Sequence, residues 1–260
     1  MLLAIDVGNT NTVFAIFHGD TVIAQWRMMT DARRTADEYA ACLFPLMSYV
    51  KLGSSDITAV VASFVVPRAI FPIKSFCKEH FNVEPMVVGD PAVKTGVKIL
   101  LDQPREVGAD LIVNAVAAWQ RHRKAMVIVD FGTATTFQVI DDKGSLIGGC
   151  IAPGVNLSLE ALHMAASQLP TVEVADPGKV IGTGTVSAMQ AGIFYGYVGL
   201  VEGIVNRIKA EYGDSKMMTI ATGGLAPLLE TATTVIDRVE YDLTIHGLNI
   251  IYKMNANYGT

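Results

Sequence analysis

An aspartate that ends a buried apolar run and is followed at once by a glycine turn occurs twice in this chain. The first copy covers residues 2–12 (LLAIDVGNTNT) and the second covers residues 127–136 (VIVDFGTATT). Each copy predicts a buried strand, a tight turn and a second strand that returns beside the first. Overlaid, the copies match Asp6 with Asp130, Gly8 with Gly132, Thr12 with Thr136 and Ile16 with Ile140. The repeat therefore predicts two related half-molecules.

The residue types in the repeated turn favour a phosphate and metal site. A glycine lets backbone amides approach an oxyanion, hydroxyls add hydrogen-bond donors, and a carboxylate can hold a hard cation. A carboxylate at the carboxyl end of a buried strand also lies where α/β sheets bind ligands. Because the chain contains no GxxxxGK[ST] loop, phosphate binding would depend on turn amides, hydroxyls and a metal ion.

Composition narrows the class of protein. Hydrophobic residues make up 51% of the 260 residues, which is enough for sizeable cores and excludes a disordered chain. The net charge of −5 argues against nucleic acid or an anionic membrane as the main partner. Three widely spaced cysteines predict reduced thiols, and neither a signal peptide nor a membrane span is expected. We expect a soluble, cytoplasmic protein.

Strands precede helices in both halves, which predicts an α/β fold with mixed sheets. A capping box at Thr35 predicts a helix start, and Pro104 is placed where another helix would begin. Later helices are expected at about 154–165, 183–211 and 243–255. The natural boundary divides the chain into residues 1–118 and 119–260.

Three further segments are candidates for the site. Gly108, expected one turn inside the helix from Pro104, would weaken that helix, so something must approach closely there. Asp110 follows among apolar positions; it is either a solvent-facing acid or a partly buried carboxylate that accepts a proton from a substrate hydroxyl. The glycine pair in residues 221–225 is either a shelf for a base or a plain strand-to-helix turn. Residues 182–185 precede a helix, where a threonine is either a cap or an anion donor.

Together these segments resemble the acetate and sugar kinase/Hsc70/actin superfamily, and more closely the type III pantothenate kinases. The resemblance implies two ribonuclease-H-like, actin-like ATPase halves, each a mixed sheet flanked by helices. The matching segments run from residue 6 to residue 225. They are residues 6–12, 104–110 with Asn114, 130–136, 148–149 with 153–154, 169–170, 182–185 and 221–225.

The resemblance also implies roles. The family transfers the γ-phosphoryl group of ATP to pantothenate, the first step of coenzyme A biosynthesis, with Asp110 as proton acceptor. Asp6 would hold Mg²⁺, Asp130 would hold K⁺ or NH₄⁺, and a homodimer would share its active site. The residues implied for ATP are Asp6, Val7, Gly8, Asn9, Thr10, Asn11, Thr12, Val13 and Thr133. Those implied for pantothenate are Leu101, Gly108, Ala109, Asp110, Leu111 and, from the partner subunit, Thr185.

This sequence departs from the family pattern on the acceptor side. The family usually has arginine where this chain has Leu111, and commonly tyrosine where it has Leu101. Both family residues help to grip pantothenate, so their loss keeps two alternatives open. One is a kinase for another small alcohol, and the other is a catalytically impaired nucleotide-binding regulatory or accessory protein.

Overall fold

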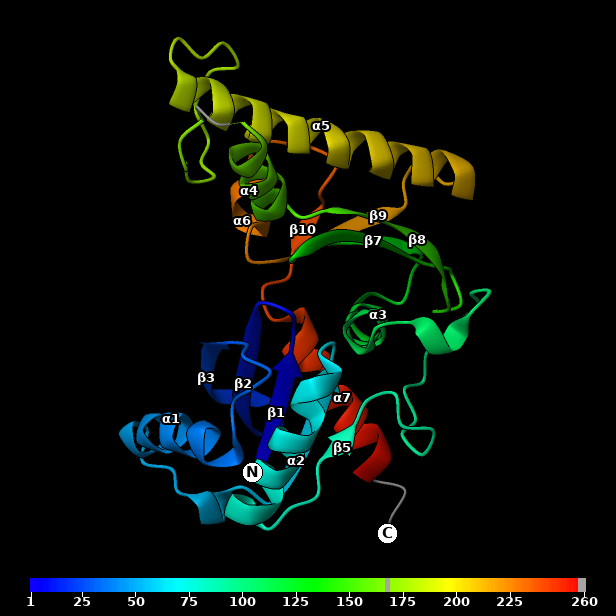
Figure 1. Ribbon diagram of the computed structural model, residues 1–260. Helices are drawn as coiled ribbons and strands as arrows, with labels where there is room; N and C mark the ends of the chain where they lie inside the picture. Colours follow the sequence, from blue (N-terminus) through cyan, green and yellow to red (C-terminus); the bar gives the residue numbers. More distant parts are fainter. Residues whose placement is uncertain (167–168, 257–260) are drawn as a thin grey trace. The chain divides into compact units, whose positions relative to one another are not determined.

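Two five-stranded sheets of identical topology form the framework of this protein (Figure 1). The computed structural model describes residues 1–166 and 169–256. Contacts divide the chain into two units. Unit 1 comprises Met1–Val97, Gln103–Arg121 and the described part of Leu243–Thr260, and unit 2 comprises Lys98–Asp102 and His122–Asp242. The expected boundary at 118/119 therefore requires correction, because the C-terminal helix returns to the first unit and packs on its sheet.

The sheet of unit 1 has the order β3-β2-β1-β4-β5, with β2 antiparallel and β4 parallel to β1. Its apolar strands pack against two amphipathic helices, α1 and α2, through a core that includes Tyr39 and Phe76. Helix α1 begins after the expected capping box, in which Thr35 and Glu38 satisfy each other's backbone amides. The elements are β1 (Leu2–Val7), β2 (Asn11–His18), β3 (Thr21–Met29), α1 (Ala36–Tyr49), β4 (Ala59–Phe64), α2 (Ile70–Phe81), β5 (Met86–Val87), α3 (Ala109–His122) and α7 (Leu243–Ala256).

The sheet of unit 2 repeats this arrangement in the order β8-β7-β6-β9-β10. Helix α5 crosses one face of this sheet, where Phe194, Val198 and Val201 join its core (Figure 1). By length and composition α5 could also cross a membrane, but it contributes these buried side chains to the core of the unit. The elements are β6 (Met126–Phe131), β7 (Ala134–Ile140), β8 (Leu146–Pro153), α4 (Val155–Ala165), α5 (Thr185–Tyr212), β9 (Met218–Gly223), α6 (Ala226–Glu230) and β10 (Arg238–Val239).

Strand pairing confirms the repeat but shifts its alignment by one residue after the turn. Val7 pairs with Thr12 across a turn of four residues, whereas Phe131 pairs with Thr135 across a turn of three. Thr12 is therefore the counterpart of Thr135, not of Thr136, and Ile16 is the counterpart of Val139, not of Ile140. The overlay was wrong there because an ungapped sequence match cannot register the extra residue in the first turn.

Candidate active site

Asp6 stands at the carboxyl end of β1 and is half-buried. The parallel neighbour of Asp6 is Ser63 on β4, and the Ser63 hydroxyl donates a hydrogen bond of 2.7 Å to Asp6 Oδ1. This bond orients the carboxylate without cancelling its charge. Ser63 has no motif of its own, because its relation to Asp6 arises from pairing between strands 57 residues apart.

The turn after β1 is held in shape by Thr30, which the sequence did not indicate. The Thr30 hydroxyl donates to the Gly8 carbonyl at 2.8 Å and lies 2.9 Å from the Thr12 hydroxyl. Among the residues expected to bind ATP, Thr12 and Val13 have buried side chains. Asn9, Thr10 and Asn11 are exposed at the turn. We infer that Thr12 supports this turn and that the exposed residues and turn amides are available to a ligand.

Asp130 stands at the corresponding end of β6. It pairs with Thr136 on β7 and lies beside Thr222 on β9. Gly223, which follows Thr222, has a φ of +92°, and a Cβ there would lie 2.7 Å from Asp130 Oδ1. This position requires glycine because the backbone passes so close to the carboxylate. Gly224, the next residue, faces open space. In residues 221–225 a flat base would therefore have room beside Gly224, and this binding shelf stays a prediction.

Asp110 lies in the first turn of α3, and the expected helix start at Pro104 is wrong. Residues Pro104–Glu106 form a separate 3₁₀ turn, and α3 begins at Ala109. Gly108 therefore precedes the helix, so a glycine at this position needs another explanation than a weakened helix. A Cβ at residue 108 would clash with Asp110 Oδ1. Glycine at 108 thus makes room for the Asp110 carboxylate.

The electrostatics of Asp110 suit a proton acceptor. Burial raises the pKa of this carboxyl, while the backbone amide of Leu111, 2.9 Å from Asp110 Oδ1, acts in the opposite direction. The N-terminus of α3 also stabilises negative charge at this position. A carboxylate with a raised pKa and a fixed orientation is poised to accept a proton from a nearby hydroxyl.

The residues expected around pantothenate fall in both units. Ala109 is buried and Leu111 is half-buried, next to Asp110 in unit 1. Leu101 belongs to unit 2, where the short segment Lys98–Asp102 joins the sheet through a bridge between Ile99 and Leu146. Arg105 and Lys98 are exposed cations near Leu111 and Leu101 in the sequence.

Thr185 is the first residue of α5 and is exposed. It lines an open, mainly apolar hollow of about 460 Å³ within unit 2, together with Leu162, Leu169, Ala188, Met189, Gly192 and Ile193. The helix predicted at 183–211 is thus confirmed to within two residues. The side-chain hydroxyl of Thr185 is one of few polar groups that line this hollow.

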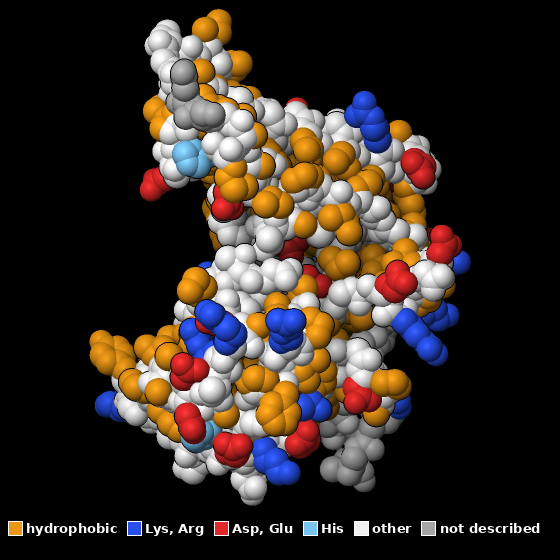
Figure 2. Space-filling view, in the orientation of Figure 1, with side chains coloured by type: hydrophobic (Ala, Val, Ile, Leu, Met, Phe, Trp, Pro, Cys, Tyr) orange, Lys and Arg blue, Asp and Glu red, His pale blue; other side chains and the backbone are white. Residues whose placement is uncertain are grey.

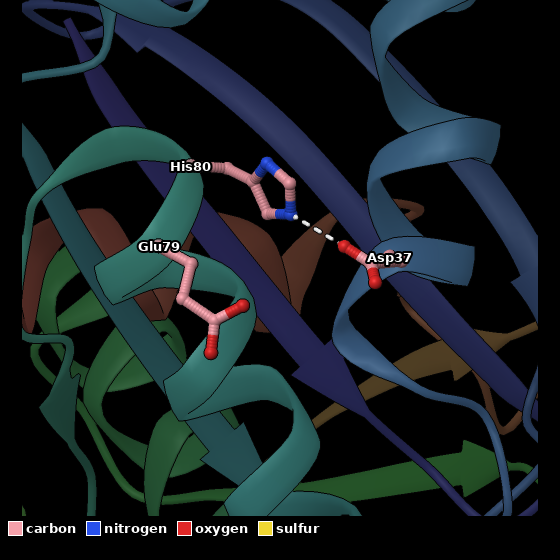
Figure 3. A group of neighbouring side chains, drawn as sticks. All are labelled: Asp37, Glu79 and His80. Atoms are coloured by element: carbon pink, nitrogen blue, oxygen red, sulfur yellow. Dashed lines mark ion pairs between the residues drawn. The ribbon is translucent and has the colours of Figure 1, made fainter.

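A separate group of metal-ligand side chains lies on the surface of unit 1 (Figure 3). Within the described residues, Asp37, Glu79 and His80 place one ligand atom each within 4.8 Å of the others, and His80 Nε2 is 3.4 Å from Asp37 Oδ1. Asp37 is 88% exposed in the first turn of α1, where the helix dipole favours a carboxylate, and His80 lies in the last turn of α2. We read the group as a surface ion pair outside the candidate active site.

The duplicated arrangement of strands and helices is also found in solved structures of other proteins. The fold, two mixed sheets each flanked by helices, is the actin-like, sugar-kinase-like fold expected from the sequence. A protein from Sinorhizobium meliloti described as a 2-dehydro-3-deoxygalactonokinase superposes with a TM-score of 0.61 over 98% of this chain and 96% of its own. Its sequence identity is 11%, so this likeness concerns the fold alone.

Sequence comparison then gives the family. The family described as type III pantothenate kinase matches residues 2–207. The type III pantothenate kinase of Paramagnetospirillum magneticum is 54% identical over 256 residues, covering 98% of each chain. That of Rhodospirillum rubrum is 53% identical, covering 98% of this chain and 99% of its own. The chain belongs to the type III pantothenate kinase family.

Proposed function

We propose that this protein phosphorylates pantothenate with ATP. The observation that carries the proposal is a half-buried, oriented Asp110 in a chain more than half identical to a type III pantothenate kinase over almost its full length. In the reaction the primary hydroxyl oxygen of pantothenate forms a bond to the γ-phosphorus and the bond to the ADP oxygen breaks. The hydroxyl proton passes to Asp110, and the products are ADP and 4′-phosphopantothenate.

In this proposal the turns after β1 and β6 bind the phosphates of ATP. The exposed turn from Gly8 to Asn11 offers backbone amides and hydroxyl or amide side chains, and Thr133 offers the same groups in the second turn. Asp6 would hold Mg²⁺; the fit is supported by an oxygen ligand that Ser63 orients and that a hard cation prefers. When bound, Mg²⁺ neutralises phosphate charge, and this chain's residues position the reactants.

Asp130 would hold a monovalent cation, K⁺ or NH₄⁺. The fit is supported by oxygen atoms around it, since the Thr136 and Thr222 side chains occupy the paired positions on both neighbouring strands. A large monovalent ion suits a single carboxylate in such neutral, oxygen-rich surroundings. The ion and Asp130 together would leave little net charge at this strand end.

The acceptor site is proposed to be shared in a homodimer, with Thr185 of one subunit serving the other. Exposed apolar side chains around α4 and the start of α5 support such an interface; Figure 2 shows orange side chains gathered over this unit. They include Met164, Val180, Ile181 and Val186, which are 48–83% exposed. A cytoplasmic location is part of the proposal, supported by cysteines that form no disulfide in the described structure.

A coupled assay tests the proposed reaction. Purified protein with Mg²⁺, K⁺, ATP and pantothenate is expected to release ADP and 4′-phosphopantothenate in equal amounts. Absence of turnover at millimolar pantothenate, with ATP still bound, would instead support a nucleotide-binding accessory protein. Faster turnover of a less acidic alcohol from a panel of acceptors would identify a kinase for another substrate.

Leu111→Arg is expected to lower the KM for pantothenate about ten- to a hundredfold. A charged hydrogen bond to the pantothenate carboxylate is worth roughly 1.5–3 kcal/mol, and the leucine cannot supply it. The KM for ATP should not change, because the added guanidinium follows Asp110 on the acceptor side. Steady-state kinetics on both substrates measures the effect, with Arg105→Leu as a control that removes a nearby exposed cation. An unchanged KM in Leu111→Arg would show that this chain grips pantothenate by other groups.

A further inference from the structure

Strand β7 carries three polar side chains with unused hydrogen-bonding groups in the described structure, and two of them, Thr136 and Gln138, share one face of the sheet. Gln138 is only 2% exposed, and neither its amide oxygen nor its amide nitrogen has a hydrogen-bond partner among residues 1–166 and 169–256. The buried hydroxyl of Thr136 likewise has none in that part of the chain. A buried amide or hydroxyl without a partner costs free energy, and native proteins usually satisfy such groups with ordered water.

Both side chains lie on the same face of the sheet as Asp130. Thr136 is directly opposite Asp130 in the antiparallel pair of β6 and β7, and Gln138 is opposite Ile128, two residues further from the strand end. Residues two apart on a strand share a face. Asp130, Thr136 and Gln138 thus form a polar row that leads from the strand end into the unit.

The duplicated fold provides an internal comparison. The counterparts of Thr136 and Gln138 in unit 1 are Val13 and Ala15, which pair with Asp6 and Ala4. Both counterparts are apolar and buried. The same sheet position therefore folds without any polar side chain. Folding of this sheet therefore does not explain why unit 2 has polar side chains at these positions.

Ordered water would complete the hydrogen bonding of this row. Gly149 of β8, the pairing partner of Gln138 on its other side, does not provide the space, because a Cβ there would lie 2.0 Å from the Phe137 carbonyl oxygen. A water molecule at the end of the Gln138 side chain could bond to its amide and to Thr136. It would also have a chain of oxygen atoms leading toward Asp130.

We propose that Thr136 and Gln138 hold ordered water behind Asp130 and so position its carboxylate for the monovalent cation. This inference rests on the proposed role of Asp130. Thr136 and Gln138 are positioning residues: they act on the cation through water and the carboxylate and touch neither substrate. Mutation of residues that orient a metal ligand commonly lowers metal affinity by about 10–100-fold.

The test replaces the row with apolar side chains of similar size, in Thr136→Val and Gln138→Met. The concentration of K⁺ that gives half-maximal activity is expected to rise about tenfold in each variant. The increase in Tm when K⁺ replaces Na⁺ at constant ionic strength is expected to shrink. Thr219→Val is the matched control, because the Thr219 hydroxyl is also buried without a partner in the described structure but lies on the opposite face, toward the core.

The outcomes separate this inference from the proposed reaction. Altered K⁺ dependence in the row variants, with wild-type behaviour in Thr219→Val, supports it. Equal K⁺ dependence in wild-type and row variants overturns it, as does an equal effect in Thr219→Val or a wild-type enzyme that turns over without any response to K⁺. If no pantothenate is phosphorylated, the proposed function fails and the K⁺-dependent Tm alone decides the role of the row.

Discussion

Asp110→Asn is expected to lower kcat for pantothenate phosphorylation about 10²–10⁴-fold, the range in which general-base catalysis acts. Asparagine has nearly the same shape, and its side-chain oxygen can still accept the hydrogen bond from the Leu111 amide. It cannot take up the proton of the substrate hydroxyl. The KM for ATP is expected to stay near the wild-type value, since Asp110 is placed with the acceptor. Steady-state kinetics with each substrate varied in turn measures both quantities.

The pH dependence of Asp110 gives a second signature. Burial raises the pKa of its carboxyl, so wild-type kcat should increase with pH over a range above that of an ordinary aspartate. This increase should be missing in Asp110→Asn. A residual activity with the same pH profile as wild type would assign the proton transfer to another group.

The same pKa shift predicts that the variant folds at least as well as wild type. A carboxyl with a raised folded-state pKa binds its proton more tightly in the folded protein than in the unfolded chain. Its favourable contribution to stability is present below the unfolded-state pKa and is lost as pH rises through the folded-state pKa. Asparagine removes this loss, so at neutral pH the Tm of Asp110→Asn should equal or exceed that of wild type.

A neighbouring carboxylate provides the control. Glu106 is exposed in the 3₁₀ turn before α3 and has the same charge. Glu106→Gln is expected to retain wild-type kcat and its pH profile. An equal loss in this control would mean that general charge near α3, rather than proton transfer by Asp110, sets the rate.

The sequence predicted the duplicated architecture because local patterns encode it. An apolar run, an aspartate and a glycine turn specify strand, strand end and hairpin, and these were confirmed in both sheets. The alignment of the copies after the turn was wrong by one residue, since turn length is visible only in the pairing. The return of α7 to unit 1 also escaped prediction. It depends on packing against β1 and β4, more than 170 residues earlier in the chain.

The sequence likewise predicted the acidic residues of the candidate site but not the residues that support them. Asp6, Asp130 and Asp110 stand out because carboxylates are unusual among apolar residues, and the strand-end positions of Asp6 and Asp130 follow from the pattern. Ser63, Thr30 and Gln138 gave no signal, because each acquires its meaning from a strand neighbour distant in sequence. Gly108 was noticed for the wrong reason: its glycine accommodates the Asp110 carboxylate and does not interrupt a helix.

Asp6→Asn is expected to lower kcat/KM for ATP about a hundredfold or more at fixed Mg²⁺. Stabilisation of phosphate charge by a bound metal is worth several kcal/mol, and each ~1.4 kcal/mol corresponds to a factor of ten. Asparagine keeps an oxygen that can accept the Ser63 hydrogen bond, so the fold around the strand end should persist. Raising Mg²⁺ should recover part of the activity, because the neutral amide binds the ion more weakly. Kinetics over a series of Mg²⁺ concentrations measures this.

Ser63→Ala separates the charge of Asp6 from its orientation. It removes only the 2.7 Å hydrogen bond to Asp6 Oδ1 and leaves the carboxylate charged. A loss of about tenfold is expected, as for other groups that orient a metal ligand, and Mg²⁺ should again restore activity. If Asp6→Asn loses no more than Ser63→Ala, the negative charge of Asp6 is not what binds the ion. If neither variant responds to Mg²⁺, the metal is held by other residues, and Asp6 serves only to shape the turn that follows β1.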